Sequence, residues 1–359
     1  MQTYLVYFVA FSIVLFLAYL AQRNNRKKYL IFAALILSLL AGLRATTVGI
    51  DTENYSNLFT HIADGRLDLA YGLETSFKYI CAVLLGIWNN SNFLFTIFAL
   101  ITNILIFVRL WDYKDQISIP WSVAIYLAMF YFMTFNILRQ FVAIAIIFYG
   151  TRYLARKKYV AFLAFVSIAF LFHKSAILGV GFLLLEVFSW KQLSKIQRKY
   201  LRILIAAAPV VAVVAAAVLL SRYVAYISQT TFNFGVMLFV KVLIFLFTLM
   251  VFKHSYTDRT DEEGCMLAEY SLKTARVYYL VGLLVAMLGY VFMFMERIGL
   301  YFYVFEIVYV GMFLKSKRVD FIFKMLIAAF YLLLFALTFF GDGQGQSDYL
   351  FFWQAELGT

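Results

Sequence analysis

Long apolar runs, separated by short polar segments, recur along the whole chain. A helix needs about 20 predominantly apolar residues to cross a hydrocarbon core of about 30 Å, and most of these runs approach that length. The pattern therefore predicts an all-α polytopic integral membrane protein with about twelve transmembrane helices. We expect these helices at residues 1–21, 29–43, 92–110, 120–136, 138–154, 159–172, 175–190, 203–220, 235–252, 276–295, 298–314 and 321–340.

One apolar segment, residues 77–88, is too short to fit this series, and it carries Lys78. If it crossed the membrane, the basic segments that follow would fall on the wrong side. A stretch of about a dozen residues is typical of re-entrant or interfacial elements. We therefore expect a short helix of that kind on the outer side of the membrane.

Basic residues set the orientation of the predicted helices. Lys and Arg concentrate in cytoplasmic loops of membrane proteins, so we place all four basic clusters inside and both termini outside. We expect the whole chain, 1–359, to form one membrane domain with an outer loop at 44–76 and a cytoplasmic loop at 253–275. The four clusters are Arg23-Arg26-Lys27-Lys28, Arg152-Arg156-Lys157-Lys158, the stretch 191–202, and Lys315-Lys317-Arg318.

Composition agrees with this assignment. The 359 residues are 64% hydrophobic and 14% charged, with a mean hydropathy of +0.86, whereas soluble domains have about 45–50% apolar and about 25% charged residues. The formal net charge is +12, but the basic residues lie between apolar runs, where they contact anionic lipid headgroups. Nucleic acid is therefore not an expected partner, and no cysteine or histidine cluster has metal-ligand spacing.

Polar residues differ on the two sides of the predicted membrane. The outer ones are single side chains of several kinds at helix ends, and charge near a bilayer is costly unless it is paired or faces a watery cavity. Because a guanidinium donates two parallel hydrogen bonds to phosphate, several arginines at one depth predict a lipid phosphate or diphosphate site. The outer set comprises Arg44, Asp51 and Tyr55; Asn136, Arg139 and Gln140; His173 and Lys174; Arg222, which opens an outer loop; and Glu296 and Arg297, which mark a fourth turn.

Simpler explanations exist for each of these residues. A lone interfacial Arg commonly anchors a helix by extending to the headgroups, Asp51 fits a helix cap, and His173 fits a turn as well as a catalytic role. Inside the spans, Lys241 and Glu306 lie at similar depth. We interpret them as a buried structural ion pair, with a polar pathway as the alternative.

Four motifs at these positions resemble those of EpsG-like, Wzy-type polysaccharide polymerases. Residues 44–55 (RATTVGIDTENY) resemble the family's Arg…Val-Gly-x-Asp-Thr-x-x-Tyr signature, and residues 136–143 (NILRQFVA) its Asn-x-x-Arg-Gln-x-x-Ala. Residues 172–176 (FHKSA) are similar to its Phe-His-x-Ser-Ala turn, and residues 297–302 (RIGLYF) to its Arg-x-x-x-Tyr-Phe motif. We find no motif of this family in 190–275 or from 341 onward.

The resemblance implies a glycosyltransferase with a GT-C-like architecture in the bacterial cytoplasmic membrane, with its active site facing outward. Such enzymes join polyprenyl-diphosphate-linked oligosaccharide repeat units into O-antigen, capsule or exopolysaccharide. The donor and the acceptor are both lipid-linked, and a flippase and a chain-length regulator are possible partners besides membrane lipid. A flippase, a related lipid-sugar ligase and a scaffold protein are the competing interpretations.

For this reaction we assign residues by the chemistry required. Fixed cations stabilise charge on the departing diphosphate, which assigns Arg44, Arg139 and Arg297. A general base for the acceptor hydroxyl nominates His173 and Asp51, and the choice between them stays open. With arginines on the diphosphate and no Asp-x-Asp motif in the outer loops, we expect no metal or other cofactor. Tyr55, Asn136, Gln140, Lys174 and Tyr301 are assigned to bind sugar hydroxyls or to orient the arginines.

Overall fold

A computed structural model describes residues 2–187, 236–256, 263–290, 293–347 and 349–357. Within these ranges the chain is helical, and its β pairing is a single antiparallel bridge between Arg44 and Phe351. The predicted span at 203–220, the basic cluster at 191–202 and Arg222 lie outside the described residues.

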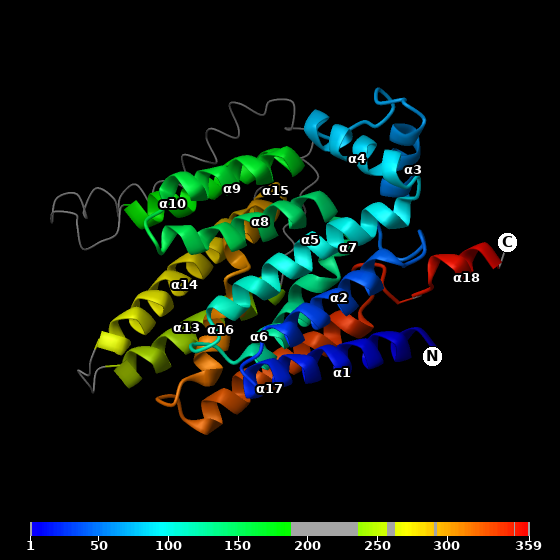
Figure 1. Ribbon diagram of the computed structural model, residues 1–359. Coiled ribbons are helices and arrows are strands. Elements are labelled where there is room, and N and C mark those ends of the chain that lie inside the picture. The colour runs from blue at the N-terminus through cyan, green and yellow to red at the C-terminus, as the bar shows by residue number, and fades with distance from the viewer. Residues whose placement is uncertain (1, 188–235, 257–262, 291–292, 348, 358–359) are drawn as a thin grey trace.

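The first half of the chain forms a row of packed helices (Figure 1). Helix α1 packs against α2, α2 against α5, α5 against α8, and α8 against α9. The predicted helices at these five places are confirmed. Their bounds are Gln2–Arg23 for α1, Lys28–Gly42 for α2, Ser91–Asp112 for α5, Leu138–Leu154 for α8 and Tyr159–Phe172 for α9.

Two shorter helices lie at one end of the bundle that these helices form. The predicted outer loop 44–76 contains α3, Thr52–Ala63, which was not expected. The short helix predicted at 77–88 is α4, Thr75–Ile87. At about 1.5 Å per residue, α4 is too short for a core of about 30 Å, so an interfacial or re-entrant position stays our prediction for it.

The predicted span 120–136 is divided into three pieces. Helix α6, Ile119–Tyr126, continues into a π-helical turn, Leu127–Tyr131, and then into α7, Met133–Asn136. The π turn is fixed to the neighbouring helix, because the Tyr131 hydroxyl donates to the carbonyl of Leu37 in α2 at 2.8 Å. After this turn, α7 ends at Asn136, next to the start of α8.

The later helices differ more from their predicted limits. The predicted span 175–190 opens as a 3₁₀ turn, Lys174–Gly179, and continues as α10, Val180–Val187. Helix α13 is Val236–Tyr256, and α14 is Glu263–Met287. Both extend into the predicted cytoplasmic loop 253–275, so the segment between these two helices is shorter than expected.

The predicted span 298–314 is not one straight helix. It is broken between α15, Met293–Tyr303, and α16, Glu306–Lys315, which differ in direction by 41°. The expected turn at residues 296–297 is also wrong, because these residues lie in the first turns of α15. The chain then continues through α17, Phe321–Phe340, and ends with α18, Phe352–Leu357.

Several of these helices suit a membrane. Three of them, α1, α5 and α17, are long and apolar enough to cross it, and the bent pair α15–α16 meets the same criteria as one broken span. Shorter apolar helices, α2 and α9 among them, accompany these. The chain is therefore a helical membrane protein. The total of about twelve spans and the GT-C-like architecture stay predictions.

Basic clusters gather at one end of the bundle. Lys114 Nζ donates to Asn25 Oδ1 between α1 and α2 at 2.6 Å, and the Lys114 carbonyl accepts from Lys315 Nζ at 2.8 Å. Nearby, Arg152 pairs with Asp112 at 2.8 Å. Helices α3, α4 and α18 lie at the opposite end (Figure 1). The clusters brought together are those at 23–28, 152–158 and 315–318.

The predicted ion pair between Lys241 and Glu306 is confirmed. Lys241 Nζ lies 3.5 Å from Glu306 Oε2, with side chains 6% and 0% exposed. The hydroxyls of Tyr279 and Tyr331 donate to Glu306 Oε1 at 3.1 and 2.6 Å. Burying a carboxylate is costly unless it is paired and hydrogen-bonded. The Glu306 carboxylate, which lies directly after the break between α15 and α16, satisfies this condition.

Helices α14 and α15 approach closely at two glycines. A Cβ at Gly282 would lie 2.4 Å from the backbone nitrogen of Tyr303, and one at Gly299 would lie 2.9 Å from the Gly282 carbonyl oxygen. Small residues let helix backbones approach each other in membranes. This contact holds α15 against the bundle.

We predict that Gly282→Ala lowers the thermal unfolding temperature in detergent, because overpacking of this kind costs about 1–3 kcal/mol. Gly86→Ala in α4 is the matched control, since a Cβ there meets nothing within 4 Å. Equal unfolding temperatures for the two variants would contradict the close contact.

Candidate functional site

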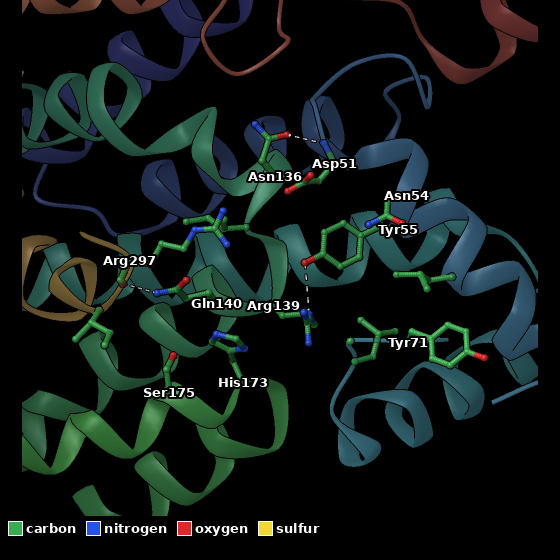
Figure 2. A pocket seen from close by; sticks show the side chains of 15 residues that line it. Asp51, Asn54, Tyr55, Tyr71, Asn136, Arg139, Gln140, His173, Ser175 and Arg297 are labelled. Atoms are coloured by element: carbon green, nitrogen blue, oxygen red, sulfur yellow. Dashed lines mark hydrogen bonds between the residues drawn. The ribbon is translucent and has the colours of Figure 1, made fainter. Parts of the chain in front are cut away.

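A cavity of about 400 Å³ opens where turns at one end of the bundle meet α3 and the loop before α4. Its volume lies in the range of ligand sites, roughly 300–1,000 Å³. Figure 2 shows side chains from several turns directed toward this space. The residues that line it are Asp51, Asn54, Tyr55, Leu58, Tyr71, Gly72, Leu73, Asn136, Ile137, Arg139, Gln140, His173, Ser175, Arg297 and Ile298.

Glu74, which we did not predict as a site residue, joins two of the predicted ones. Its Oε2 accepts a hydrogen bond from the Arg139 guanidinium, and its Oε1 lies 2.8 Å from His173 Nδ1. The backbone N–H of Lys174 also donates to Oε1, at 3.2 Å. The only feature of the local sequence that could have pointed to Glu74 is its position directly before the apolar segment of α4, where the helix dipole favours a carboxylate.

Glu74 is ionised at neutral pH. Its side chain is only 8% exposed, and burial alone would raise its pKa. The hydrogen bond from His173, the charge of Arg139 and the Lys174 amide outweigh burial and lower the pKa of Glu74 to about 2. This carboxylate is therefore a poor proton acceptor but a strong hydrogen-bond acceptor for its two neighbours.

His173 is oriented by that carboxylate. It follows the last residue of α9 in extended conformation, with φ −155° and ψ 124°, and its side chain is 26% exposed. Because an ionised carboxylate only accepts, His173 Nδ1 carries the hydrogen, and in the neutral ring Nε2 is then an acceptor. Since His173 lines the cavity, Nε2 is the nitrogen available for proton transfer there.

Arg139 is held on three sides at the start of α8. Besides its ion pair with Glu74, its Nε donates to the Tyr55 hydroxyl at 3.4 Å. The guanidinium also lies over the Phe77 ring, 5.8 Å from its centroid. The predicted orienting role fits Tyr55, which fixes Arg139 from α3. The side chain of Arg139 keeps 16% exposure and borders the cavity.

Arg297 is placed by Gln140 but keeps its guanidinium unoccupied. Gln140 Nε2 in α8 donates to the backbone carbonyl of Arg297 in α15. In the part of the chain that the structure describes, the Arg297 side chain is exposed and makes no hydrogen bond or ion pair. Figure 2 shows it extending from α15 toward the centre of the cavity. Its five N–H donors are thus available to an anion.

Arg44 does not line this cavity, contrary to the role expected for it. It is 1% exposed, and its guanidinium donates to Thr52 Oγ1 and to the Val48 and Phe135 carbonyls, each at 3.2 Å. It also lies 4.6 Å from the ring centroids of Phe95 and Phe135. With these partners Arg44 holds the turn before α3, and this geometry does not support its assignment as a diphosphate ligand.

Asn136 links the backbone of Asp51 to the side chain of Gln344. Its Oδ1 accepts from the backbone N–H of Asp51 at 3.3 Å, and its Nδ2 donates to Gln344 Oε1 at 2.7 Å. Asp51 is the N-cap residue of α3, but its side chain makes no capping bond. Its carboxylate borders the cavity. The amide of Asn136 is engaged by protein partners, which favours a structural role over sugar binding.

The C-terminal segment, residues 341–352, pairs with the turn at 43–49. Gly49 N–H donates to the Gly345 carbonyl at 2.8 Å, and Phe352 N–H donates to the Leu43 carbonyl at 2.9 Å. The Gln344 contact with Asn136 adds a side-chain link. This segment therefore supports the signature motif that carries Asp51.

Two further predicted residues lie close to the cavity but do not line it. Tyr301 is 1% exposed, and its hydroxyl is 3.0 Å from that of Ser175, which borders the cavity. Lys174 contributes its backbone N–H to Glu74, while its side chain is exposed outside the wall. Of the predicted site residues, the structure brings together Asp51, Tyr55, Asn136, Arg139, Gln140, His173 and Arg297 around the cavity and leaves Arg44, Lys174 and Tyr301 outside its lining.

These features define a helical membrane protein with an arginine- and histidine-lined cavity at one end of its bundle. The chain belongs to the EpsG family, whose model matches residues 27–352. No curated protein and no solved structure matches it. The match confirms the family that the four motifs indicated. It also runs through 190–275 and past 341, where we found no motif.

We predict that the contribution of Glu74 to stability depends on pH. Its folded pKa of about 2 lies below the unfolded value of about 4.3, so its contribution is complete above about pH 4.3 and disappears as the pH falls toward 2. The unfolding temperatures of the native protein and Glu74→Gln should differ at pH 7 and converge near pH 2. Glu53→Gln, at an exposed position in α3, is the control; a pH-independent difference for Glu74→Gln would refute the assignment.

Proposed function

We propose that this protein is a polysaccharide polymerase that joins polyprenyl-diphosphate-linked oligosaccharide repeat units. The observation that supports this most directly is the cavity itself. It brings the guanidinium of Arg297, which pairs with no residue that the structure describes, near a histidine that the Glu74 carboxylate orients. In a chain of the EpsG family, such a cavity suits transfer of a sugar from a diphosphate leaving group.

Arg297 and Arg139 hold the diphosphate of the donor. Arg297 donates to none of the described residues, whereas Arg139 already shares its charge with Glu74. Fixed cations in a site partly shielded from water stabilise the negative charge that develops as the bond to the anomeric carbon breaks. A diphosphate carries enough charge to bind Arg297 fully and to share Arg139 with Glu74. Polyprenyl diphosphate leaves with the electron pair of that bond.

His173 takes the proton from the acceptor. The acceptor hydroxyl oxygen forms the new bond to the anomeric carbon, and its proton passes to His173 Nε2 as the diphosphate departs. Glu74 stabilises the resulting imidazolium through Nδ1–H, as carboxylates do for other catalytic histidines. Asp51 is the alternative base, because its carboxylate borders the cavity. The oriented histidine favours His173.

The reaction takes place at the outer face of the bacterial cytoplasmic membrane. Three basic clusters lie at the end of the bundle opposite α3 and α4. The positive-inside rule assigns that end to the cytoplasm, which leaves the cavity facing outward. Lipid-linked repeat units that a flippase has moved across the membrane would arrive on this side.

Arg297→Ala should lower kcat/KM on the order of a hundredfold, the loss typical for removal of one group that stabilises developing charge. Arg297→Lys should recover only part of this, since it lacks the planar fork. Lys174→Ala, which removes an exposed cation outside the cavity wall, should keep nearly full activity. The initial rate of polymer formation at low concentrations of lipid-linked repeat unit, in membranes with equal protein levels, measures all three. Full activity of Arg297→Ala would exclude it as a diphosphate ligand.

Reconstitution tests the proposed reaction. Purified protein in nanodiscs, supplied with lipid-linked repeat units from the producing strain, should yield a ladder of glycan lengths, and the ladder should persist in EDTA. Loss of the ladder in EDTA would overturn metal-independent transfer. If liposomes instead show movement of the lipid-linked sugar across the bilayer without polymer, the protein is a flippase.

A further inference from the structure

The cavity has two chemically different walls. Arg139, His173 and Arg297 form a cationic wall contributed by α8, by the turn after α9 and by α15. The opposite wall comes from α3 and from the loop before α4, and it includes Asn54 and Tyr71. Figure 2 shows these two residues across the cavity from Arg297 and His173.

Tyr71 is a large aromatic side chain left open to solvent at the cavity edge. It is 74% exposed. An aromatic residue on an outer loop is often a membrane-interface anchor, but this one borders a cavity of ligand size. Ligand cavities are commonly lined by aromatic side chains, so the Tyr71 ring is placed to contact a ligand.

The loop that carries Tyr71 is anchored on both sides. Its neighbour Ala70 is completely buried, and Lys78 Nζ in α4 donates to the Leu67 carbonyl at 2.6 Å. The backbone N–H of Tyr71 donates to the Leu69 carbonyl at 2.9 Å. The exposed ring is therefore presented on a fixed backbone, which lowers the entropy cost of binding.

The chemistry of this wall suits a sugar ring and not a diphosphate. None of the five residues that it contributes beyond Asp51 and Tyr55 carries a charge, namely Asn54, Leu58, Tyr71, Gly72 and Leu73. A pyranose has a face of C–H groups that packs against an aromatic ring, while its hydroxyls both donate and accept. The Asn54 amide also does both, and it is exposed at the cavity edge.

We propose that this wall is a sugar subsite, in which Tyr71 stacks on a pyranose of the lipid-linked oligosaccharide and Asn54 hydrogen-bonds its hydroxyls. The assignment rests on the proposed function and extends it. The cationic wall takes the diphosphate, the opposite wall, which has no cation in its lining, takes the neighbouring sugar, and the anomeric carbon lies between them, near His173. Tyr71 and Asn54 are then specificity-determining residues.

Binding measurements without turnover test this subsite. The probe is the phosphate-free oligosaccharide repeat unit released from the producing strain's polysaccharide, titrated into purified protein in detergent. Tyr71→Ala should weaken its binding by roughly two- to tenfold, as loss of an aromatic stacking contact does, and Tyr71→Phe should keep it. Tyr79→Ala removes another exposed tyrosine, from α4 outside the cavity, and should bind normally.

Inorganic diphosphate is the second probe. Its binding should be unchanged in Tyr71→Ala and weakened in Arg297→Ala. Unchanged oligosaccharide binding in Tyr71→Ala, loss of both ligands together, or no oligosaccharide binding by the native protein at millimolar concentration would each overturn the subsite. If oligosaccharide binding depends on Tyr71 but reconstitution yields no polymer, the subsite stands and the polymerase assignment fails.

Discussion

A buried negative charge at Glu74 is the constraint on which the cavity depends. A carboxylate with so little exposure must be paired and hydrogen-bonded to be tolerated, and Glu74 obtains its partners from α8 and from the turn after α9. Satisfying this one group therefore draws three segments together. The same contacts give Arg139 and His173 fixed positions, so the electrostatic requirement of folding and the geometry of the site have a common origin.

Apolar run lengths predicted most helices of the N-terminal half, because each run had to satisfy its backbone hydrogen bonds internally. They did not predict the break between α15 and α16 or the π turn after α6. Each of these segments is as apolar as a continuous span. Glu306, the first residue after the break, pairs with Lys241 of α13, and a contact between distant segments leaves no periodic pattern in the sequence.

The site could be predicted from the sequence only where its turns carry recognisable motifs. The motifs placed His173, Arg139 and Arg297 near one another because they fall at helix ends on one side. Glu74 was missed because it stands in a polar loop without a motif, and only the folded chain brings it to His173. Arg44 shows the opposite case: a motif residue of the right chemical type is enclosed by carbonyls and two aromatic rings, which the sequence does not distinguish from a ligand contact.

The pairing of residues 341–352 with the turn at 43–49 has a practical consequence for topology mapping. Reporter enzymes are commonly fused to progressively shortened chains, and every truncation before residue 341 would remove the partner of that turn. The loops at the α3–α4 end of the bundle would then be reported in an altered arrangement. Reporters inserted into the exposed turn between α1 and α2, at Asn24 and Asn25, would leave the pairing intact and give a more faithful map.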